Sequence, residues 1–332
     1  MKIVVTGGMG FIGSSVLTRL LALEHKIVAI GRSANPRNAR SHPNLSYHCV
    51  DLSQRKIPEE IIRGTDLVFH IAAKAGIGGR YSDYYSANYL STVQLLETCK
   101  EHGVSRFIFT SSPSVVFSQK SISNGNESLP YLNHSGFAYA HTKALAEKHV
   151  LLAHKPGSFQ SLALRPHLVW GTADPHLLPR VIQRHKAGKL RIVGEGRNRI
   201  DLTHVKNVAH AHLLAMQKMI ADERFGGKPY FISQDEPVAL WGWLNEIFLA
   251  LQLPPLESKV SFRKAYLAGW LMEKVWQLPF FKGDPPMTRF VASQLAHDHW
   301  FSNKEALSDF GYSPILSMED GLKETLPWLR TL

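Results

Sequence analysis

The chain has 332 residues, of which 44% are hydrophobic, so it can form one large α/β domain with a full core and a smaller appended lobe. The formal net charge of +11 favours phosphate-rich ligands or anionic membrane surfaces. Its basic residues are scattered without a basic helix, so nucleic acid is not an expected partner. The sequence has no uninterrupted apolar run of about 18 residues, so a membrane span is not expected. The chain begins directly with a strand, without a signal-peptide core, so a cytoplasmic location is expected.

The first thirteen residues predict a nucleotide-binding turn. The apolar run 3–5 predicts a buried strand, and apolar side chains repeat at helical spacing over 11–20. Glycines between them allow a tight turn, a close approach of backbone to a pyrophosphate, and close packing of helix on strand. A tight turn without a ligand is the alternative. The cofactor contacts predicted in this turn are Gly7, Gly10, Phe11, Ile12 and Gly13.

Strands and helices alternate through the first half of the chain. Crossovers of this kind predict a parallel sheet that is buried on both faces and binds ligands at the carboxyl ends of its strands. We therefore expect an α/β fold: a Rossmann-type doubly wound parallel sheet over residues 1–170, to which some later segments return. Residues 171–332 are expected to form mainly a smaller C-terminal substrate lobe. The further strands predicted in the first half are 27–30, 45–50, 67–71 and 106–110.

The end of the second strand bears on cofactor choice. An acidic residue there would hold the adenosine ribose hydroxyls, but Gly31 takes that position, followed by Arg32 and Ser33. Arg32 can pair with a 2′-phosphate through two hydrogen bonds, so NADP(H) is preferred over NAD(H). The alternative is that Arg32 is an ordinary solvated charge.

Small residues at the end of the fourth strand, Ala72 and Ala73 before Lys74, let a flat cofactor lie against the backbone. His70 beside them is expected to be a hydrogen-bonded core histidine rather than a catalyst. Asn88 is placed on the inner face of the helix that follows. Cys49 and Cys99 are expected to be buried free thiols in a reducing compartment.

Tyr139 and Lys143 carry the predicted chemistry. After a polar loop over 119–135 they open a helix running to about residue 154, and their i,i+4 spacing places both on one face. A neighbouring ammonium is expected to lower the phenol pKa and make Tyr139 a general acid/base near neutral pH. Ser112 is the predicted partner for the same substrate oxygen, and Ser111 is the fallback. The pattern is common, and packing with a surface lysine is its alternative.

These motifs resemble those of the extended short-chain dehydrogenase/reductases over nearly the whole chain. The resemblance implies that Ser112 is the catalytic serine, Tyr139 the proton donor, and Lys143 its activator and a contact of the nicotinamide ribose. It also implies that residues 164–171 pass beside the nicotinamide. The cofactor contacts that it adds to those above are Asp51, Leu52, Ala72, Ala73, Lys74, Asn88, Ser111, Pro166 and Leu168.

The second half is similar to the 3β-hydroxysteroid dehydrogenase family, which includes sterol dehydrogenases and bacterial reductases of long-chain β-keto acids in olefin biosynthesis. The matching segments are 177–188, 191–196, 201–205, 285–290 and 310–314. The resemblance implies that the chain interconverts a ketone and a secondary alcohol on a hydrophobic substrate, and that it forms a homodimer. Two alternatives stay open: a nucleotide-sugar epimerase or isomerase, and a non-catalytic NADPH sensor. Val116-Phe117, where sugar-nucleotide enzymes usually have Tyr-Gly, argues against the first.

Segment 262–281 is rich in aromatic and aliphatic side chains. It could wall the substrate site, pack as ordinary core, or lie on an anionic bilayer as a peripheral membrane contact. The basic residues that flank its apolar side chains are Arg263, Lys264, Lys274 and Lys282.

The other candidates in the second half are weaker. His204, His210 and His212 cluster without a placed acidic ligand, so no metal site is expected. Asp201 could hold a substrate hydroxyl or cap the helix that starts near residue 204. Arg289 could pair with a substrate carboxylate or form a salt bridge within the C-terminal lobe. The terminal helix, 317–329, is expected to dock rather than catalyse.

Overall fold

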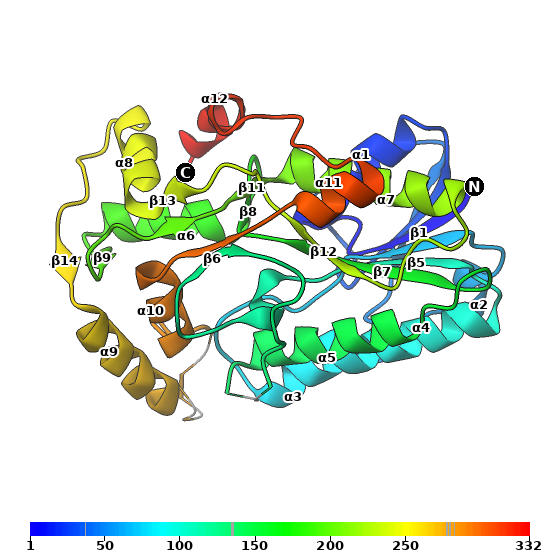
Figure 1. Cartoon of the computed structure of the whole chain (residues 1–332), viewed down its shortest axis with the longest axis horizontal. Helices are drawn as coiled ribbons and strands as arrows, with labels where there is room; N and C mark the ends of the chain where they lie inside the picture. The colour runs from blue at the N-terminus through cyan, green and yellow to red at the C-terminus, as the bar shows by residue number, and fades with distance from the viewer. Residues whose placement is uncertain (37, 134–135, 277, 279, 282) are drawn as a thin grey trace.

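A seven-stranded sheet, parallel throughout, organises the molecule (Figure 1). The computed structural model describes residues 1–332 except 37, 134–135, 277, 279 and 282. The strand order β12-β7-β5-β4-β1-β2-β3 is that of a Rossmann fold, which confirms the predicted fold class. The strands are β1 (Lys2–Thr6), β2 (Lys26–Gly31), β3 (Leu45–Cys49), β4 (Leu67–His70), β5 (Arg106–Thr110), β7 (Gln160–Pro166) and β12 (Pro229–Ile232).

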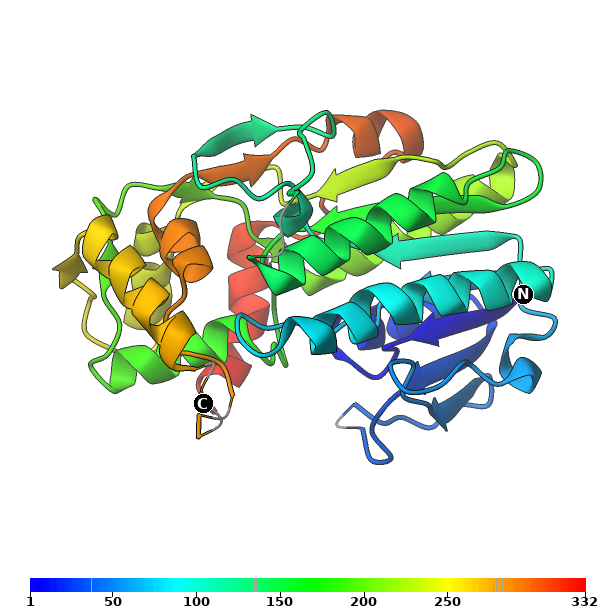
Figure 2. The same ribbon diagram turned by 90° about the horizontal axis from the view of Figure 1, so that it is seen from below.

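Helices cover both faces of the sheet, as the apolar strands require. Ile3 and Val5 belong to the core under α1 (Phe11–Leu21), α7 (Val205–Ala221) and α11 (Lys304–Phe310). Val4 points the other way, into the core under α4 (Ser91–Glu101) and α5 (Ala138–Leu152), because side chains alternate along a strand. Figure 2 shows α4 and α5 side by side across this second face. Short elements precede α4: α2 (Glu59–Ile62), α3 (Tyr81–Tyr84) and a π-helical turn, Tyr85–Leu90.

The second lobe has its own core, centred on Trp170, Trp241 and Trp243. Its helices are α6 (Leu177–Lys186), α8 (Leu240–Ala250), α9 (Phe262–Val275), α10 (Arg289–Ala296) and α12 (Met318–Leu329). Short strand pairs stitch it together: β8 (Val169–Trp170) with β11 (Thr203–His204), and β9 (Ile192–Val193) with β14 (Lys259–Val260). A four-stranded sheet joins β6 (Ile122–Gly125), β10 (Arg199–Ile200), β13 (Val238–Ala239) and β15 (His299–Phe301).

Two sequence expectations are wrong. The segment 119–135 is not all loop, because residues 122–125 form β6 and pair with β15, which is formed by His299–Phe301 much later in the chain. Residues 134 and 135 of that segment lie outside the described residues. Cys49 is exposed, because the edge strand β3 turns it to solvent, whereas Cys99 is a buried free thiol as expected. In the described part of the chain, no helix is both long enough and apolar enough to cross a bilayer.

A fully buried ion pair fixes α5 against the sheet. The Arg165 guanidinium on β7 donates to the Glu147 carboxylate on α5 from Nη2 at 2.5 Å and from Nε at 3.1 Å. The Tyr131 hydroxyl donates to the same carboxylate at 2.7 Å, and the Arg165 side chain stacks on Phe231. Because breaking such a pair leaves an uncompensated buried charge, it holds α5 in one register on the sheet.

Candidate active site

The glycine turn after β1 is built for a close-lying ligand. Gly7 has a left-handed φ of +68°, and a side chain there would meet the Ala72 backbone nitrogen at 2.9 Å. A Cβ on Gly13 would overlap the Gly7 carbonyl oxygen, so α1 packs directly on the turn. This backbone therefore fits the pyrophosphate of a dinucleotide, which needs free amide groups at a helix N-terminus and no side chain in its way.

A cleft of about 880 Å³ opens from this turn along the carboxyl ends of β1, β2 and β4. Ten of the predicted cofactor contacts line it: Gly7, Gly10, Phe11, Arg32, Ser33, Asp51, Leu52, Ala72, Ala73 and Lys74. The other predicted contacts lie outside its lining: Ile12, Gly13, Asn88, Ser111, Tyr139, Lys143, Pro166 and Leu168. The structure thus brings the glycine turn and three strand ends into one elongated site.

The polar end of the cleft is shaped around Arg32 and Ser33, which are both exposed. Tyr47 from β3 donates to the Ser33 carbonyl at 2.5 Å and fixes this turn. A hydrogen bond from the Ser53 hydroxyl lowers the Asp51 pKa, and the nearby Arg32 charge lowers it further. The Arg32 guanidinium makes no ion pair or hydrogen bond within the described chain, so its donors are available to a ligand.

A buried chain of hydrogen bonds runs beneath the cleft. Thr6 contacts His70 Nδ1 at 2.7 Å, and His70 Nε2 contacts Thr92 at 2.9 Å. Burial lowers the His70 pKa to about 3, so the imidazole is neutral, which confirms the expected core histidine. Thr92 in turn donates to the carbonyl of Asn88.

Asn88 acts on the cleft through the backbone. Its side-chain oxygen accepts from the Lys74 amide at 2.7 Å, and its amide nitrogen donates to the Lys74 carbonyl at 3.1 Å. The amide nitrogen also reaches Thr142 on α5. Through these hydrogen bonds Asn88 joins the cleft wall to α5, the helix of Tyr139. Asn88 lies within the π-helical turn, a local irregularity of the kind found at functional sites.

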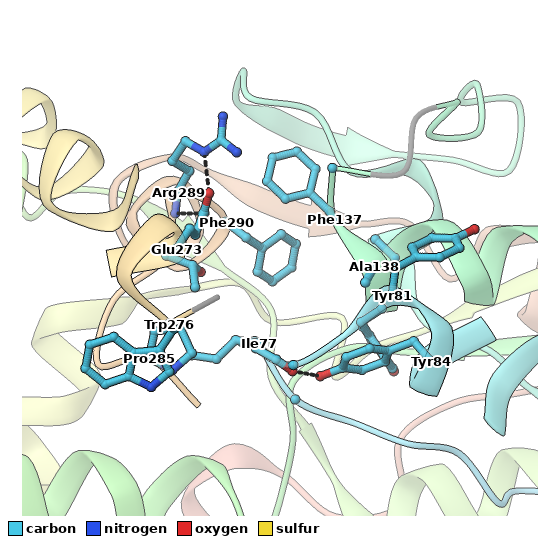
Figure 3. Close-up of a pocket in the computed structure, with 17 residues that line it drawn as sticks. Ile77, Tyr81, Tyr84, Phe137, Ala138, Glu273, Trp276, Pro285, Arg289 and Phe290 are labelled. Atoms are coloured by element: carbon cyan, nitrogen blue, oxygen red, sulfur yellow. Dashed lines mark hydrogen bonds and ion pairs between the residues drawn. The ribbon is translucent and has the colours of Figure 1, made fainter. Parts of the chain in front are cut away.

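Tyr139 lines a second, smaller pocket of about 340 Å³, the tyrosine pocket. Figure 3 shows its two sides: Tyr81, Tyr84 and Ala138 from the sheet domain face Trp276, Pro285 and Phe290 from the C-terminal lobe. Segment 76–79 lines it and continues the Ala72–Lys74 stretch of the cleft, so the phenol stands beside the cleft at the strand ends.

Ser112 follows β5 and faces Tyr139. Its hydroxyl oxygen accepts from the Ser114 amide at 3.2 Å and from the Ser114 hydroxyl at 3.0 Å, so its own proton is left for another acceptor. The Ser112 hydroxyl lies near the Tyr139 phenol and acts to lower its pKa. Ser111, the fallback, is buried, and its hydroxyl has no partner among the described residues.

Lys143 lies one turn beyond Tyr139 but does not lower the phenol pKa. Its ammonium donates to the Thr110 carbonyl at 2.6 Å and lies 3.9 Å from the centre of the Phe109 ring. Burial lowers the Lys143 pKa to about 7, so it carries only part of a charge at neutral pH. Burial also raises the Tyr139 pKa, against the smaller lowering effect of Ser112. The predicted downward shift is therefore wrong, and the phenol is protonated at neutral pH.

The C-terminal candidates have structural partners. Arg289 pairs with Glu273 at 2.7 Å, which confirms the alternative of a salt bridge within the lobe. Asp201 caps no helix: it accepts from His167 and from the Phe301 amide, while His204 caps α7. His210 and His212 are separated, and no group of three or more His, Cys, Asp or Glu side chains in the described chain could hold a metal.

The tyrosine pocket contains groups that the sequence motifs did not indicate. The Tyr84 hydroxyl donates to the Gly78 carbonyl at 2.6 Å, and the Gly78 amide donates to Asp284 across the domain boundary at 3.1 Å. The three glycines at 76, 78 and 79 were the signal, because such a cluster is typical of a close backbone approach. Leu168, predicted beside the nicotinamide, has a positive φ of +36°. The sequence could not predict this strained backbone, because leucine rarely adopts a positive φ.

Comparison with known proteins identifies the lineage. Residues 4–262 match the model of the 3-beta hydroxysteroid dehydrogenase/isomerase family. The chain belongs to this family. As a member it is an NAD(P)-dependent oxidoreductase, and the glycine turn and the cleft fit such a cofactor.

Two relatives are similar to nearly the whole chain. A 2-alkyl-3-oxoalkanoate reductase of Stenotrophomonas maltophilia is 38% identical, over 97% of this chain and 98% of its own. The sterol-4-alpha-carboxylate 3-dehydrogenase, decarboxylating, of Bos taurus is 32% identical, over 97% and 90%.

Solved structures support the fold of this family member. A UDP-glucuronic acid 4-epimerase from Bacillus cereus, in complex with NAD, superposes with a TM-score of 0.78 over 100% of this chain and 99% of its own. Its sequence identity is 22%, so the likeness shows the Rossmann-type architecture and not the reaction.

Replacing Lys143 with Met should change how stability depends on pH. Between the folded pKa of about 7 and the unfolded value of about 10.4, the unfolded chain holds a proton that the folded chain does not, so stability rises with pH. The unfolding free energy of the native chain relative to the Met variant should rise by about 2 kcal/mol between about pH 7 and about pH 9. Urea unfolding at both pH values measures it. An unchanged difference would contradict the buried, weakly basic lysine.

Proposed function

We propose that the chain is an NADP(H)-dependent reductase of a carbonyl carbon on a hydrophobic β-keto carboxylate. The observation that carries this is the Tyr139 phenol in a pocket beside the glycine-turn cleft, with the Ser112 hydroxyl near it. Two neighbouring hydroxyls can both donate to a carbonyl oxygen and stabilise the charge that develops on it. The raised pKa of Tyr139 keeps its proton in place until the substrate oxygen becomes basic.

The residues of the chain divide the work. Ser112 donates a hydrogen bond to the substrate oxygen, which it can do because Ser114 already fills its acceptor positions. Tyr139 donates a second hydrogen bond and then its proton. NADPH bound in the cleft would supply the hydride for the carbonyl carbon, and the product would be a secondary alcohol. Lys143 donates to the Thr110 carbonyl and so fixes the first turns of α5 at the end of β5, which positions Tyr139.

Two relatives suggest the substrate class. In both names, 2-alkyl-3-oxoalkanoate and sterol-4-alpha-carboxylate, the carboxylate is attached to the carbon next to the one that is reduced or oxidised. The tyrosine pocket offers one arginine, Arg289, whose Nε binds Glu273 and whose two terminal nitrogens have no hydrogen-bond partner among the described residues. Phe137, Phe290 and Trp276 supply apolar walls for an alkyl or ring system.

Tyr139→Phe should lower kcat by about 100-fold or more, because it removes the proton donor and leaves the cleft unchanged. NADPH affinity, measured by fluorescence titration, should stay near that of the native chain. Tyr266→Phe is the control, since that hydroxyl lies outside the pocket lining and should not matter. Turnover of Tyr139→Phe at the native rate would remove the assignment. Cofactor retained through purification with no net reduction of any ketone would favour the epimerase alternative.

Arg32→Ala should weaken NADPH binding about 10- to 100-fold, because a 2′-phosphate loses a charge-assisted pair, and should leave NADH binding nearly unchanged. Arg40→Ala is the matched control: this exposed arginine donates to Thr18 and lies outside the cleft lining. Equal loss of affinity for both cofactors would contradict the NADP(H) preference.

Arg289→Met should raise KM for a long-chain β-keto acid about tenfold or more and leave KM for the corresponding neutral ketone unchanged, because only the acid loses an ion pair. Glu273→Gln is the matched control. It breaks the same salt bridge but keeps the arginine, so it should not raise KM for the acid. If both variants behave alike, Arg289 only ties α10 to α9.

A further inference from the structure

The outward face of α9 has the wrong polarity for a helix facing water. The buried side of α9 is made of small residues, Ala265 and Gly269, and a Cβ on Gly269 would meet the Thr288 backbone at 2.5 Å. Phe262 and Tyr266 are half-buried against the core of the second lobe, but most of the other large apolar side chains of α9 face solvent. Those exposed here and in the turn that follows are Leu267, Trp270, Leu271, Val275, Leu278, Phe280 and Phe281, nearly half of the large exposed hydrophobics described in the chain.

This arrangement is not that of ordinary core over the described residues after 266, whereas Phe262, Ala265 and Tyr266 do pack on the core of the second lobe. A core helix turns its large side chains inward, whereas Leu267 is 57% exposed and Phe280 88% exposed. Figures 1 and 2 show α9 at the outer edge of the molecule in both views, with α10 packed along it. Contiguous apolar surface of this kind marks a contact with another surface.

The charges around the apolar face indicate which surface that is. Arg263, Lys264 and Lys274 are exposed on the same side of α9. Glu273, the one acidic residue of α9, turns inward to Arg289. The outward face of α9 therefore presents apolar side chains with bases only. Lys282 lies outside the described residues and is not part of the argument.

We infer that the outward face of α9, together with Leu278, Phe280 and Phe281 after it, docks on an anionic lipid bilayer. Apolar side chains enter the boundary between headgroups and acyl chains, while the three bases pair with lipid phosphates. The net charge of +11 adds a long-range attraction to the same surface. A second copy of this chain fits less well, because it would place two sets of bases against each other.

The docked orientation gives the tyrosine pocket a lipid-side entrance. Glu273 and Trp276 on the inner side of α9 line the pocket, so one short helix separates the apolar face from the substrate site. Trp276 stacks on Phe281 with ring centres 4.6 Å apart, which links the pocket wall to the exposed turn. A hydrophobic substrate therefore passes from bilayer to pocket beside α9. This last step rests on the proposed function, whereas the docking does not.

Vesicle co-sedimentation tests the docking. The full chain is mixed with phosphatidylcholine vesicles that contain or lack phosphatidylglycerol. It should sediment with the anionic vesicles, and Leu267→Ser with Leu271→Ser should lower the bound fraction about tenfold or more. Lys264→Glu with Lys274→Glu should abolish the dependence on anionic lipid. The matched controls are Leu152→Ser, at the exposed C-terminal end of α5, and Lys155→Glu, three residues later; both should sediment like the native chain.

The outcomes separate docking from catalysis and from dimer formation. No sedimentation of the native chain, or equal sedimentation of the α9 variants, overturns the inference. A dimer in light scattering that the Leu267→Ser, Leu271→Ser variant breaks, without vesicle binding, assigns the face to a second copy and also overturns it. Reduction of a water-soluble ketone without vesicles should be unchanged in these variants, and its absence in every form would count against the proposed function instead.

Discussion

The position of α5 on the sheet is the constraint on which the site depends. Lys143 reaches the carbonyl at the end of β5, and Glu147, one turn later, is held by Arg165 on β7. Both contacts are buried, so neither exchanges readily with water, and a small rotation of α5 would break them together. Tyr139 stands one turn before Lys143, and its direction is therefore set by two polar anchors on two neighbouring strands.

The electrostatics of the site follow from this burial. An ammonium that is held in a dry site beside an aromatic ring and a carbonyl loses much of its charge near neutral pH, as the Lys143 pKa of about 7 shows. Burial raises the pKa of the Tyr139 phenol, which therefore keeps its proton, and the Ser112 hydroxyl lies near it. A site in this state suits proton donation to a carbonyl oxygen, which is the reductive direction of the reaction.

Much of the fold could be predicted from the sequence, because local patterns determine it. The strands 3–5, 27–30, 67–71 and 106–110 are short apolar runs, and they occur in the structure within a residue or two of the predicted bounds. The glycines at 7, 10 and 13 are required by sterics that depend on near neighbours alone. The homodimer and the boundary at residue 170 stay predictions.

The parts that failed depend on distant segments. β6 forms because it pairs with β15, and nothing in residues 122–125 themselves predicts that partner. The spacing of Tyr139 and Lys143 gave their shared face correctly but not the sign of the Tyr139 pKa shift, because that sign depends on how deeply the folded chain buries both side chains. The face of α9 was ambiguous for the same reason: only the packing of Gly269 on Thr288 shows which side is inward.

A crystal structure of the chain with NADPH and a non-reducible β-keto acid analogue tests the central claim most directly. The account predicts that the carbonyl oxygen of the analogue lies about 3 Å from both the Ser112 and the Tyr139 hydroxyls, with the nicotinamide at the end of the cleft next to them. A phenol turned into the protein, or an analogue bound away from the tyrosine pocket, would contradict it.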